Sequence, residues 1–388
     1  MISPKYKNIY DRFIEFYKTT HINPWHEINE TELNRLYDEL TNSMDIVDGY
    51  NFKYFMDYII KRLNGETDAH THYYSISIIP INFRVFENVI LVNYPEPLKG
   101  AKLLSINGIN IDDIIKEIDN VITYGTKGKR IYELEKSLFN RNILFGLPSL
   151  RNSDKLDFEV ESINGEKRII TFEKSTKYTN NQLFDYDEYR YGKNTSYSFI
   201  DNCLIYNHSS VQMRFKEDIE QAINNLRKEN IDDIDTIIID LRGNTGGNSS
   251  LNRILIDYLE EHKDKKLICL TDYRVFSGGR YALRDLINLG AITIGEEIST
   301  PINCYGNSNW VDIYGHNFMV SECYFHPTLG WSASSKEEYN REVTDELLKP
   351  YIFKPDILIE QTKEDYVQGI DTILDYAIEY SKTMSLKK

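Results

Sequence analysis

The sequence lacks a surplus of basic residues, because 45 Lys and Arg stand against 60 Asp and Glu and give a formal net charge of -15. This balance argues against a nucleic-acid partner, which needs a basic surface. The chain also lacks any apolar run of about 18 residues, and its first ten residues, Met1 to Tyr10, contain no apolar core of the kind that a signal peptide has. We therefore expect no membrane span and, by default, a cytoplasmic location. A secreted protein whose signal had been removed would show the same pattern.

Cysteine, proline and glycine are also scarce. The four cysteines have no CxxC spacing and lie in apolar, strand-like runs: Cys203, Cys269, Cys304 and Cys323. This pattern predicts reduced core thiols rather than zinc ligands or a disulfide framework. With 388 residues, 41% of them hydrophobic, and only 10 prolines and 20 glycines, the composition indicates a folded globular protein of two or three domains.

Changes in hydrophobic periodicity divide the chain into five segments. They are a helical subdomain (1–66), a strand belonging to the core and carrying a histidine (67–80), an inserted α+β module (81–175), a loop or linker (176–197) and an α/β core (198–388). Asn-Gly turns at Asn107 and Asn164 support the α+β assignment of the inserted module.

Strands and helices alternate through the α/β core. Strands are expected at 203–207, 236–241, 267–271 and 291–295, and helices at 215–229, 249–262, 278–289 and 364–382. Repeated β-α-β units imply a mostly parallel sheet with right-handed crossovers. Ligands of such sheets bind at the carboxyl ends of the strands.

Two glycine-rich turns follow strands at that edge. One is Asp240-Leu-Arg-Gly-Asn-Thr-Gly246-Gly247, and the other is Phe276-Ser277-Gly278-Gly279. A serine at the head of a helix is exposed beside free amides and the positive end of the helix dipole. The pair therefore predicts that Ser277 is a nucleophile and that N–H groups of Gly278 and of Gly246 or Gly247 form an oxyanion hole.

Simpler roles remain open for both turns. Serine is a common helix N-cap, and paired glycines often make a tight strand-to-helix turn. The first turn is not a phosphate loop, because no Gly-Lys-Ser/Thr follows it, and it lacks dinucleotide spacing. Asp240 and Arg242 are expected to pin this turn through charge-assisted hydrogen bonds rather than to act in catalysis.

The order of these motifs resembles that of the C-terminal-processing (tail-specific) serine peptidases, which include tricorn-core members. The matching strings are Asp-Leu-Arg-x-Asn-x-Gly-Gly, then Phe-Ser-Gly-Gly, Ile-Gly-Glu at 294–296, Lys-Pro-Asp-Ile at 354–357 and Gly-Ile-Asp at 369–371. The resemblance implies a crotonase/ClpP-like α/β core and a PDZ-like module within 81–175. It also implies acyl-enzyme hydrolysis of peptide or protein substrates without a cofactor, and it leaves homo-oligomerisation open.

The same family activates its serine either by a downstream lysine or by an upstream histidine in an Asp-Gly-His-Thr motif. No lysine lies between Lys266 and Lys336, which excludes a local Ser-Lys dyad. Asp68-Ala-His70-Thr matches the histidine motif with Ala in place of Gly, so the resemblance implies that His70 is the general base. In tricorn-like members a small polar residue before the histidine relays to an orienting glutamate, but Ala69 stands there in this chain. The candidate glutamates are Glu337, Glu338 and Glu342.

Other interpretations of these residues stay open. Asp68, His70 and His72 alternate, so they could form half of a metal site on one strand face. Two departures from the family pattern suit a catalytically inactive homologue that binds peptide or lipid-like ligands. Ala69 replaces a glycine, and Arg280 stands where many relatives carry a glutamate after the serine. A crotonase-type acyl-CoA enzyme would need a basic nucleotide site, and no basic cluster indicates one.

Overall fold

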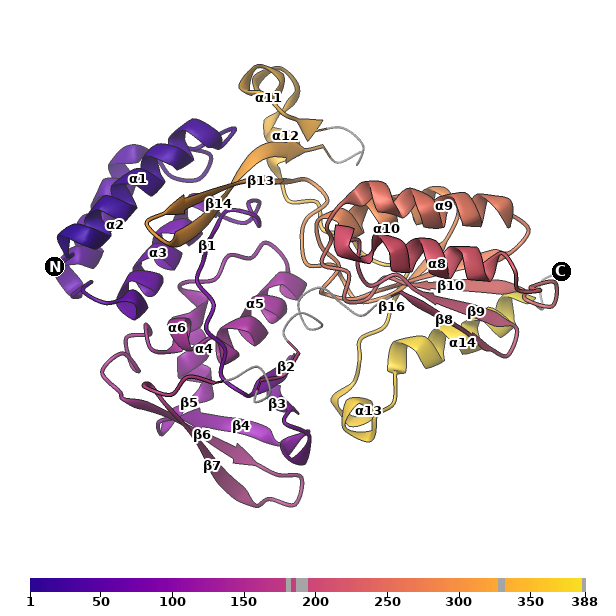
Figure 1. Cartoon of the computed structure of the whole chain (residues 1–388), viewed down its shortest axis with the longest axis horizontal. Coiled ribbons are helices and arrows are strands. Elements are labelled where there is room, and N and C mark those ends of the chain that lie inside the picture. Colours follow the sequence, from indigo (N-terminus) through magenta and orange to yellow (C-terminus); the bar gives the residue numbers. More distant parts are fainter. Residues whose placement is uncertain (179–182, 186–194, 327–331, 386–388) are drawn as a thin grey trace. The chain divides into compact units, whose positions relative to one another are not determined.

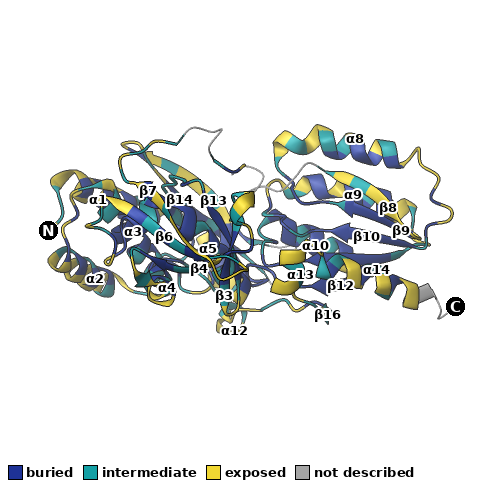
Figure 2. Cartoon of the chain, turned by 90° about the horizontal axis from the view of Figure 1, so that it is seen from below, coloured by how far each residue is buried: buried dark blue, intermediate teal, exposed yellow. Residues whose placement is uncertain are grey.

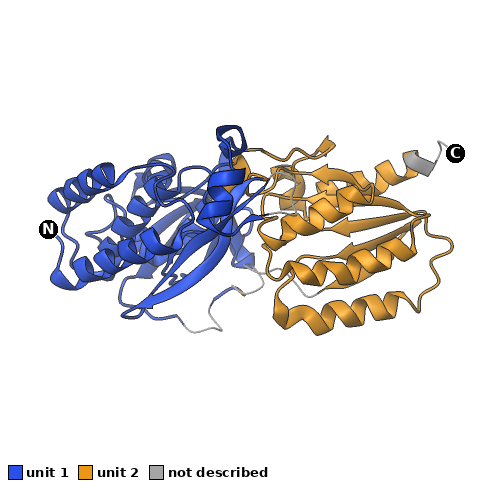
Figure 3. Cartoon of the chain, turned by 90° about the horizontal axis from the view of Figure 1, so that it is seen from above, with its two compact units in different colours: residues 1–125, 130–184, 303–350 blue, residues 126–129, 185–302, 351–388 orange. Residues whose placement is uncertain are grey.

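The computed structural model describes residues 1–178, 183–185, 195–326 and 332–385, and the chain forms two compact units (Figure 3). The first unit contains residues 1–125, 130–184 and 303–350, and the second contains 126–129, 185–302 and 351–388. Residues 303–350, which the periodicity assigned to the α/β core, lie in the first unit instead. The reason is that the hairpin they form pairs with a strand near His70 and packs on the first helix.

Three helices open the first unit, as the periodicity predicted. They are α1 (Pro4–Thr20), α2 (Glu30–Ser43) and α3 (Gly49–Asn64). Side chains cap two of them, because Asn29 accepts the amide of Glu32 and Asp48 accepts those of the first residues of α3. Each helix buries an apolar stripe. For example, Ile9 and Phe13 of α1 are fully buried.

The helices cover an antiparallel sheet that carries the His70 segment. Its strands are β1 (His72–Tyr74), β13 (Cys304–Ile313), β14 (His316–Phe325) and β15 (Ser332–Ala333), and β14 is central. Aromatic rings join sheet and helix, with the Phe13 and Phe318 ring centroids 4.7 Å apart. The short helices α11 (Lys336–Glu342) and α12 (Asp345–Leu348) follow β15.

A second sheet of the first unit contains the predicted α+β module. Its strands are β2 (Asn82–Phe86), β3 (Val89–Tyr94), β4 (Lys102–Ile106), β5 (Ile109–Asn110), β6 (Lys155–Glu161) and β7 (Lys167–Glu173). The helices are η1 (Glu96–Leu98), α4 (Ile111–Asp119), α5 (Lys127–Phe139) and α6 (Arg141–Leu144). Asn107 and Gly108 both have positive φ, 52° and 76°, as a tight turn between β4 and β5 requires.

The second unit is a three-layer α/β/α structure. Its strands are β8 (Ser196–Ile200), β9 (Cys203–Asn207), β10 (Thr236–Asp240), β11 (Lys266–Thr271), β12 (Ile292–Gly295) and β16 (Ile357–Leu358). Its helices are η3 (Met213–Phe215), α8 (Lys216–Leu226), η4 (Ser249–Leu251), α9 (Asn252–Glu261), α10 (Gly278–Asn288), α13 (Lys363–Gln368) and α14 (Thr372–Ser385).

The strand order is β16-β12-β11-β10-β9-β8, and all neighbouring strands are parallel except β8 and β9. Helices α8, α9 and α10 lie on one side of the sheet and α14 on the other (Figure 1). All five residues of β10 are buried, and the outer helix surfaces carry the exposed residues (Figure 2). Ile238, Ile268 and Ile294 pack against α14, each contributing about 1.5–3 kcal/mol of burial.

One expectation about the segments needs correction, and another falls partly on residues that the structure does not describe. The final helix predicted over 364–382 is two helices, because Gly369 adopts a left-handed φ of 75° that ends α13. The predicted linker 176–197 includes residues 179–182 and 186–194, which lie outside the described residues, and β8 begins within it at Ser196.

Two expectations drawn from composition can also be compared with the structure. All four cysteines are buried free thiols, which confirms that prediction. In the part of the chain that the structure describes, no helix has the length and apolar character to cross a membrane.

Candidate active site

Ser277 lies at a sharp turn between β11 and α10. Its backbone has φ 48° and ψ -117°, a conformation in which a non-glycine residue is strained. Ser277 occupies the N-cap position of α10, but its side chain makes no capping hydrogen bond to the helix. A strained serine between a strand and a helix has the local geometry of a nucleophile elbow, which presents the hydroxyl away from its own helix.

The two glycine turns meet at this serine. Gly246 has φ 94°, and a Cβ added to it would lie 2.8 Å from the Cβ of Ser277 and 2.6 Å from the amide nitrogen of Gly278. A Cβ added to Gly278 would lie 2.8 Å from the carbonyl oxygen of Gly247. Only residues without a side chain permit this approach. The second unit therefore brings the predicted nucleophile and the predicted oxyanion turn together.

Hydrogen bonds narrow the choice of oxyanion donors. The amide of Gly246 donates to Oδ1 of Asn244 at 3.0 Å, so it is already engaged. Within the residues that the structure covers, the amides of Gly247 and Gly278 donate to no other group. Gly278 is the first residue of α10, where the helix leaves amides unsatisfied. These two amides are the donors best suited to a developing negative charge.

A buried asparagine, Asn244, holds the two turns together. Its side-chain Nδ2 donates to the carbonyl of His208, 2.6 Å away, and its own carbonyl accepts the amide of Phe276 at 2.9 Å. On the other side of the site, Oδ1 of Asn252 accepts Nε2–H of His208 at 3.0 Å, and Nδ2 of Asn252 donates to the carbonyl of Gly278 at 3.2 Å.

Sequence reasoning missed the support that His208 and Asn252 provide. Asn244 lies inside the motif quoted above, but neither His208 nor Asn252 carries a local signal. Spacing along the chain gives no sign that one asparagine joins the end of β9 to the start of α10.

The predicted pinning of the first turn is confirmed. The guanidinium of Arg242 donates to both carboxylate oxygens of Asp240, at 2.9 and 2.7 Å, and to both of Asp371, at 2.6 and 2.8 Å. Burial alone would raise the pKa of Asp371, but the hydrogen bonds from Arg242 hold it below its ordinary value. The clamp ties the oxyanion turn to the start of α14.

Arg280, which departs from the family pattern, has a structural position. Its side chain is fully buried, and Nη1 donates to the carbonyls of Pro301 and Ile302 at 3.1 and 2.9 Å. These bonds anchor the first turn of α10 to the chain that follows β12. Arg280, which stands where many relatives carry a glutamate, therefore has a structural role as a buried anchor within the second unit.

His70 lies in the first unit, in a turn just before β1. Its Nδ1 is 3.1 Å from the carbonyl oxygen of Tyr305. A carbonyl can only accept, so Nδ1 carries the ring proton and Nε2 holds the lone pair that a general base needs. Gly306 makes room for the ring, because a Cβ there would lie 3.0 Å from Cε1 of His70.

The three glutamates proposed to orient His70 lie on α11. Glu338 accepts the amide of Ser334 at 2.9 Å, and Glu342 pairs with Arg341 at 2.7 Å, while Glu337 is exposed. The Nδ1 proton of His70 is instead accepted by the main chain of β13. This donor–acceptor pair gives no sequence signal, because any residue at position 305 would supply the carbonyl.

Asp68, His70 and His72 do not lie on one strand face, as the metal interpretation requires. Only His72–Tyr74 are in a strand, and Asp68 turns inward, where its Oδ1 accepts the amides of His70 and Thr71 at 3.1 and 3.0 Å. Among the residues described, no group of three side chains is placed to hold a metal ion. Asp68 therefore serves the turn that carries His70.

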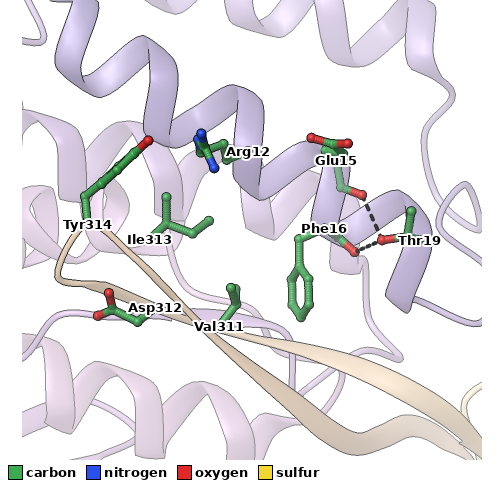
Figure 4. Close-up of a pocket in the computed structure, with 8 residues that line it drawn as sticks. All are labelled: Arg12, Glu15, Phe16, Thr19, Val311, Asp312, Ile313 and Tyr314. Atoms are coloured by element: carbon green, nitrogen blue, oxygen red, sulfur yellow. Dashed lines mark hydrogen bonds between the residues drawn. The ribbon is translucent and has the colours of Figure 1, made fainter.

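A groove of about 420 Å³ on the first unit is lined by α1, by the end of β13 and by Tyr314 in the turn that follows it (Figure 4). There the guanidinium carbon of Arg12 lies 5.1 Å from the ring centroid of Tyr314, a cation–π contact. The groove contains neither Ser277 nor His70, and we assign it no role in the site.

The described structure is a mixed α/β fold similar to that of S41 peptidases such as CPAF. Mature CPAF is similar over 97% of this chain and 96% of its own, with a TM-score of 0.62 and 9% identity. CPAF complexed with lactacystin is similar over 98% of both chains, with a TM-score of 0.60 and 9% identity. A photosystem II D1 C-terminal processing protease covers 96% of both chains with a TM-score of 0.45 and 10% identity.

No protein-family model and no curated protein matches the sequence. The resemblance inferred from the motifs is confirmed as a likeness of fold over nearly the whole chain.

Proposed function

We propose that this protein is a serine peptidase that cleaves peptide bonds through an acyl-enzyme. One observation carries the proposal. Ser277, which has a strained backbone and occupies the N-cap of α10, lies against a second glycine turn, and the amides of Gly247 and Gly278 beside it are available as donors. A nucleophile and its oxyanion donors must be built together, because the donors act only where the charge develops. The likeness of fold to mature CPAF supports the same conclusion.

In the proposed reaction His70 Nε2 takes the hydroxyl proton of Ser277 as Oγ attacks the substrate carbonyl carbon. The carbonyl oxygen becomes an oxyanion and receives hydrogen bonds from Gly247 and Gly278. The imidazolium then returns the proton to the leaving amine, the C–N bond breaks, and an ester to Ser277 remains. Water, deprotonated by His70, hydrolyses that ester and restores the free serine. The Tyr305 carbonyl fixes the tautomer that this cycle requires.

We further propose that the substrates are peptides or unfolded tails, taken by endopeptidase or tail-specific cleavage. The sheet β2-β3-β4-β6-β7 with α4 and α5 has the mixed composition expected of a PDZ-like module, and we assign it substrate capture. A non-catalytic homologue that binds peptide or lipid-like ligands is the competing outcome. The departure at Arg280 no longer favours it, because that side chain is a buried anchor.

A fluorophosphonate probe tests the proposal directly. We expect the folded wild-type protein to be labelled on Ser277, as located by peptide mass spectrometry. Ser277→Ala should abolish labelling, and His70→Ala should slow it by about 10²–10⁴-fold because the base is lost. Ser250→Ala is the matched control, since this exposed serine lies in η4 beside the same turn and should not change the rate.

Two results would contradict the proposed serine peptidase activity. Labelling that persists in Ser277→Ala would assign the reactive group elsewhere. A folded wild-type protein that takes up no probe and cleaves no unfolded protein, yet binds peptide, would establish the non-catalytic homologue.

A further inference from the structure

Asp68 is a fully buried carboxylate that accepts four hydrogen bonds. Its Oδ1 accepts the amides of His70 and Thr71, as described above, and also Oγ–H of Ser321 at 2.6 Å. Its Oδ2 lies 3.1 Å from Nε2 of His21, a residue that directly follows α1. In the described part of the chain, His21 is the only partner of Oδ2.

The hydrogen bonds of His21 fix its protonation. Its Nδ1 accepts the backbone amide of Asn23 at 3.1 Å, so that nitrogen carries no proton. The ring proton is therefore on Nε2 and points at Asp68. The ring cannot swing away, because it is fully buried and stacks parallel to His26 with centroids 5.0 Å apart. Its centroid also lies 4.9 Å from that of the Tyr305 ring.

His21 is one of the hydrogen-bond donors that favour the ionised form of Asp68. Burial alone would raise the pKa of the carboxyl, but the hydrogen bonds from His21 and Ser321 hold it well below its usual range. An ionised carboxylate makes stronger hydrogen bonds to amides than a neutral one. Removing the His21 proton donor would leave Oδ2 buried without a partner, and such a group either takes up a proton or rotates.

We propose that His21 is a positioning residue for His70: acting through Asp68, it holds the turn that aims the His70 ring at its site of action. The inference rests on the proposed function, because it deepens the role given to His70. It makes the loop after α1 a working part of the peptidase, so the N-terminal helices do more than cover the sheet. His21 touches neither substrate nor the reacting atoms.

The positioning role can be tested with substitutions of His21 that place an N–H group at different distances from the backbone. The amide nitrogen of glutamine reaches about as far as Nε2 of histidine, whereas that of asparagine reaches only about as far as Nδ1. We expect His21→Ala and His21→Asn to lower kcat by about 10- to 100-fold with KM within about twofold, because misplacing a catalytic group by about 1 Å costs about that much. His21→Gln should recover most of the loss.

A control separates positioning from general weakening of the helical layer. Leu33→Ala removes a buried side chain of α2 and should lower the denaturation midpoint without altering the hydrogen bonds of Asp68. It should leave kcat near the wild-type value at a temperature where the protein remains folded. If Leu33→Ala lowers kcat as much as His21→Ala does, the role of His21 is merely structural.

The tautomer of His70 supplies a readout that does not require activity. In a long-range ¹H–¹⁵N spectrum of Ser277→Ala protein, assigned by comparison with a His70→Ala variant, we expect the His70 proton on Nδ1. His21→Ala should mix the two tautomers, and His21→Gln should restore one. A changed tautomer in a protein that never labels would refute the proposed function and leave the positioning role standing. An unchanged tautomer together with an unchanged kcat in His21→Ala would overturn the inference.

Discussion

The contact between the two glycine turns can be tested with a single methyl group. In Gly246→Ala the new carbon would lie 2.6 Å from the amide nitrogen of Gly278, 2.8 Å from the carbonyl oxygen of Phe276 and 2.8 Å from the Cβ of Ser277. Non-bonded carbon contacts are comfortable at about 3.5–4.0 Å. The nitrogen and the oxygen belong to the backbone and cannot rotate away, so the turn that carries Ser277 has to shift by about 1 Å.

Two effects add in the expected cost. The φ of 94° at Gly246 would cost a non-glycine residue about 1–2 kcal/mol, and forcing the methyl into the contact would cost about 1–3 kcal/mol more. We therefore expect Gly246→Ala to lose about 2–5 kcal/mol of unfolding free energy in urea denaturation. A displacement of about 1 Å at the nucleophile should slow fluorophosphonate labelling by about 100-fold.

Gly243→Ala is the matched control in the same turn. Gly243 also has a positive φ, 77°, but nothing lies within 4 Å of its added Cβ. It should therefore lose only the backbone cost of about 1–2 kcal/mol and label at nearly the wild-type rate. If Gly246→Ala labels as fast as Gly243→Ala, the contact between the turns does not position Ser277, and the reasoning is refuted.

Two further predictions concern the His70 seat and the Arg242 clamp. Gly306→Ala would place a Cβ 2.4 Å from Cε2 of Phe325 and 3.0 Å from Cε1 of His70, so labelling should slow by about 10-fold or more. Gly315→Ala, where nothing lies within 4 Å, should label normally, and equal rates for the two variants would contradict the prediction. Asp371 has a lowered folded pKa, so its stabilisation is present above its unfolded pKa of about 3.9 and is lost as the pH falls below that value. The difference in denaturation midpoint between wild type and Asp371→Asn should thus be largest near neutral pH and shrink below pH of about 4, and a constant difference would exclude the clamp as its cause.

Much of the second unit could be predicted from local sequence. Three consecutive isoleucines, Ile237 to Ile239, predict β10, because a central parallel strand is buried on both faces. The glycines at 246–247 and 278–279 predict turns with amides available for a ligand, since glycine tolerates the backbone that such turns need. The motif order also predicted the fold. Each of these signals lies within a few consecutive residues, so it can be recognised in a single sequence.

The sequence failed where contacts depend on segments far apart in the chain. Residues 303–350 follow the α/β core in the chain and were assigned to it, yet β13 and β14 join the first unit because β14 pairs with β1 and lies on α1. The sequence also gives no indication that the carbonyl of Tyr305 accepts the Nδ1 proton of His70. Every residue has a main-chain carbonyl, so the sequence does not indicate which carbonyl will accept a hydrogen bond.

By itself, then, the sequence determined the four central strands of the second unit, the glycine turns and the types of residue that could carry serine chemistry. Only the tertiary structure decided which amide near Ser277 is already engaged and which side chains favour the ionised form of Asp68. The physical reason is that backbone propensity and hydrophobic period act over a few residues. A hydrogen bond between His21 and Asp68 instead depends on two segments 47 residues apart being buried against each other.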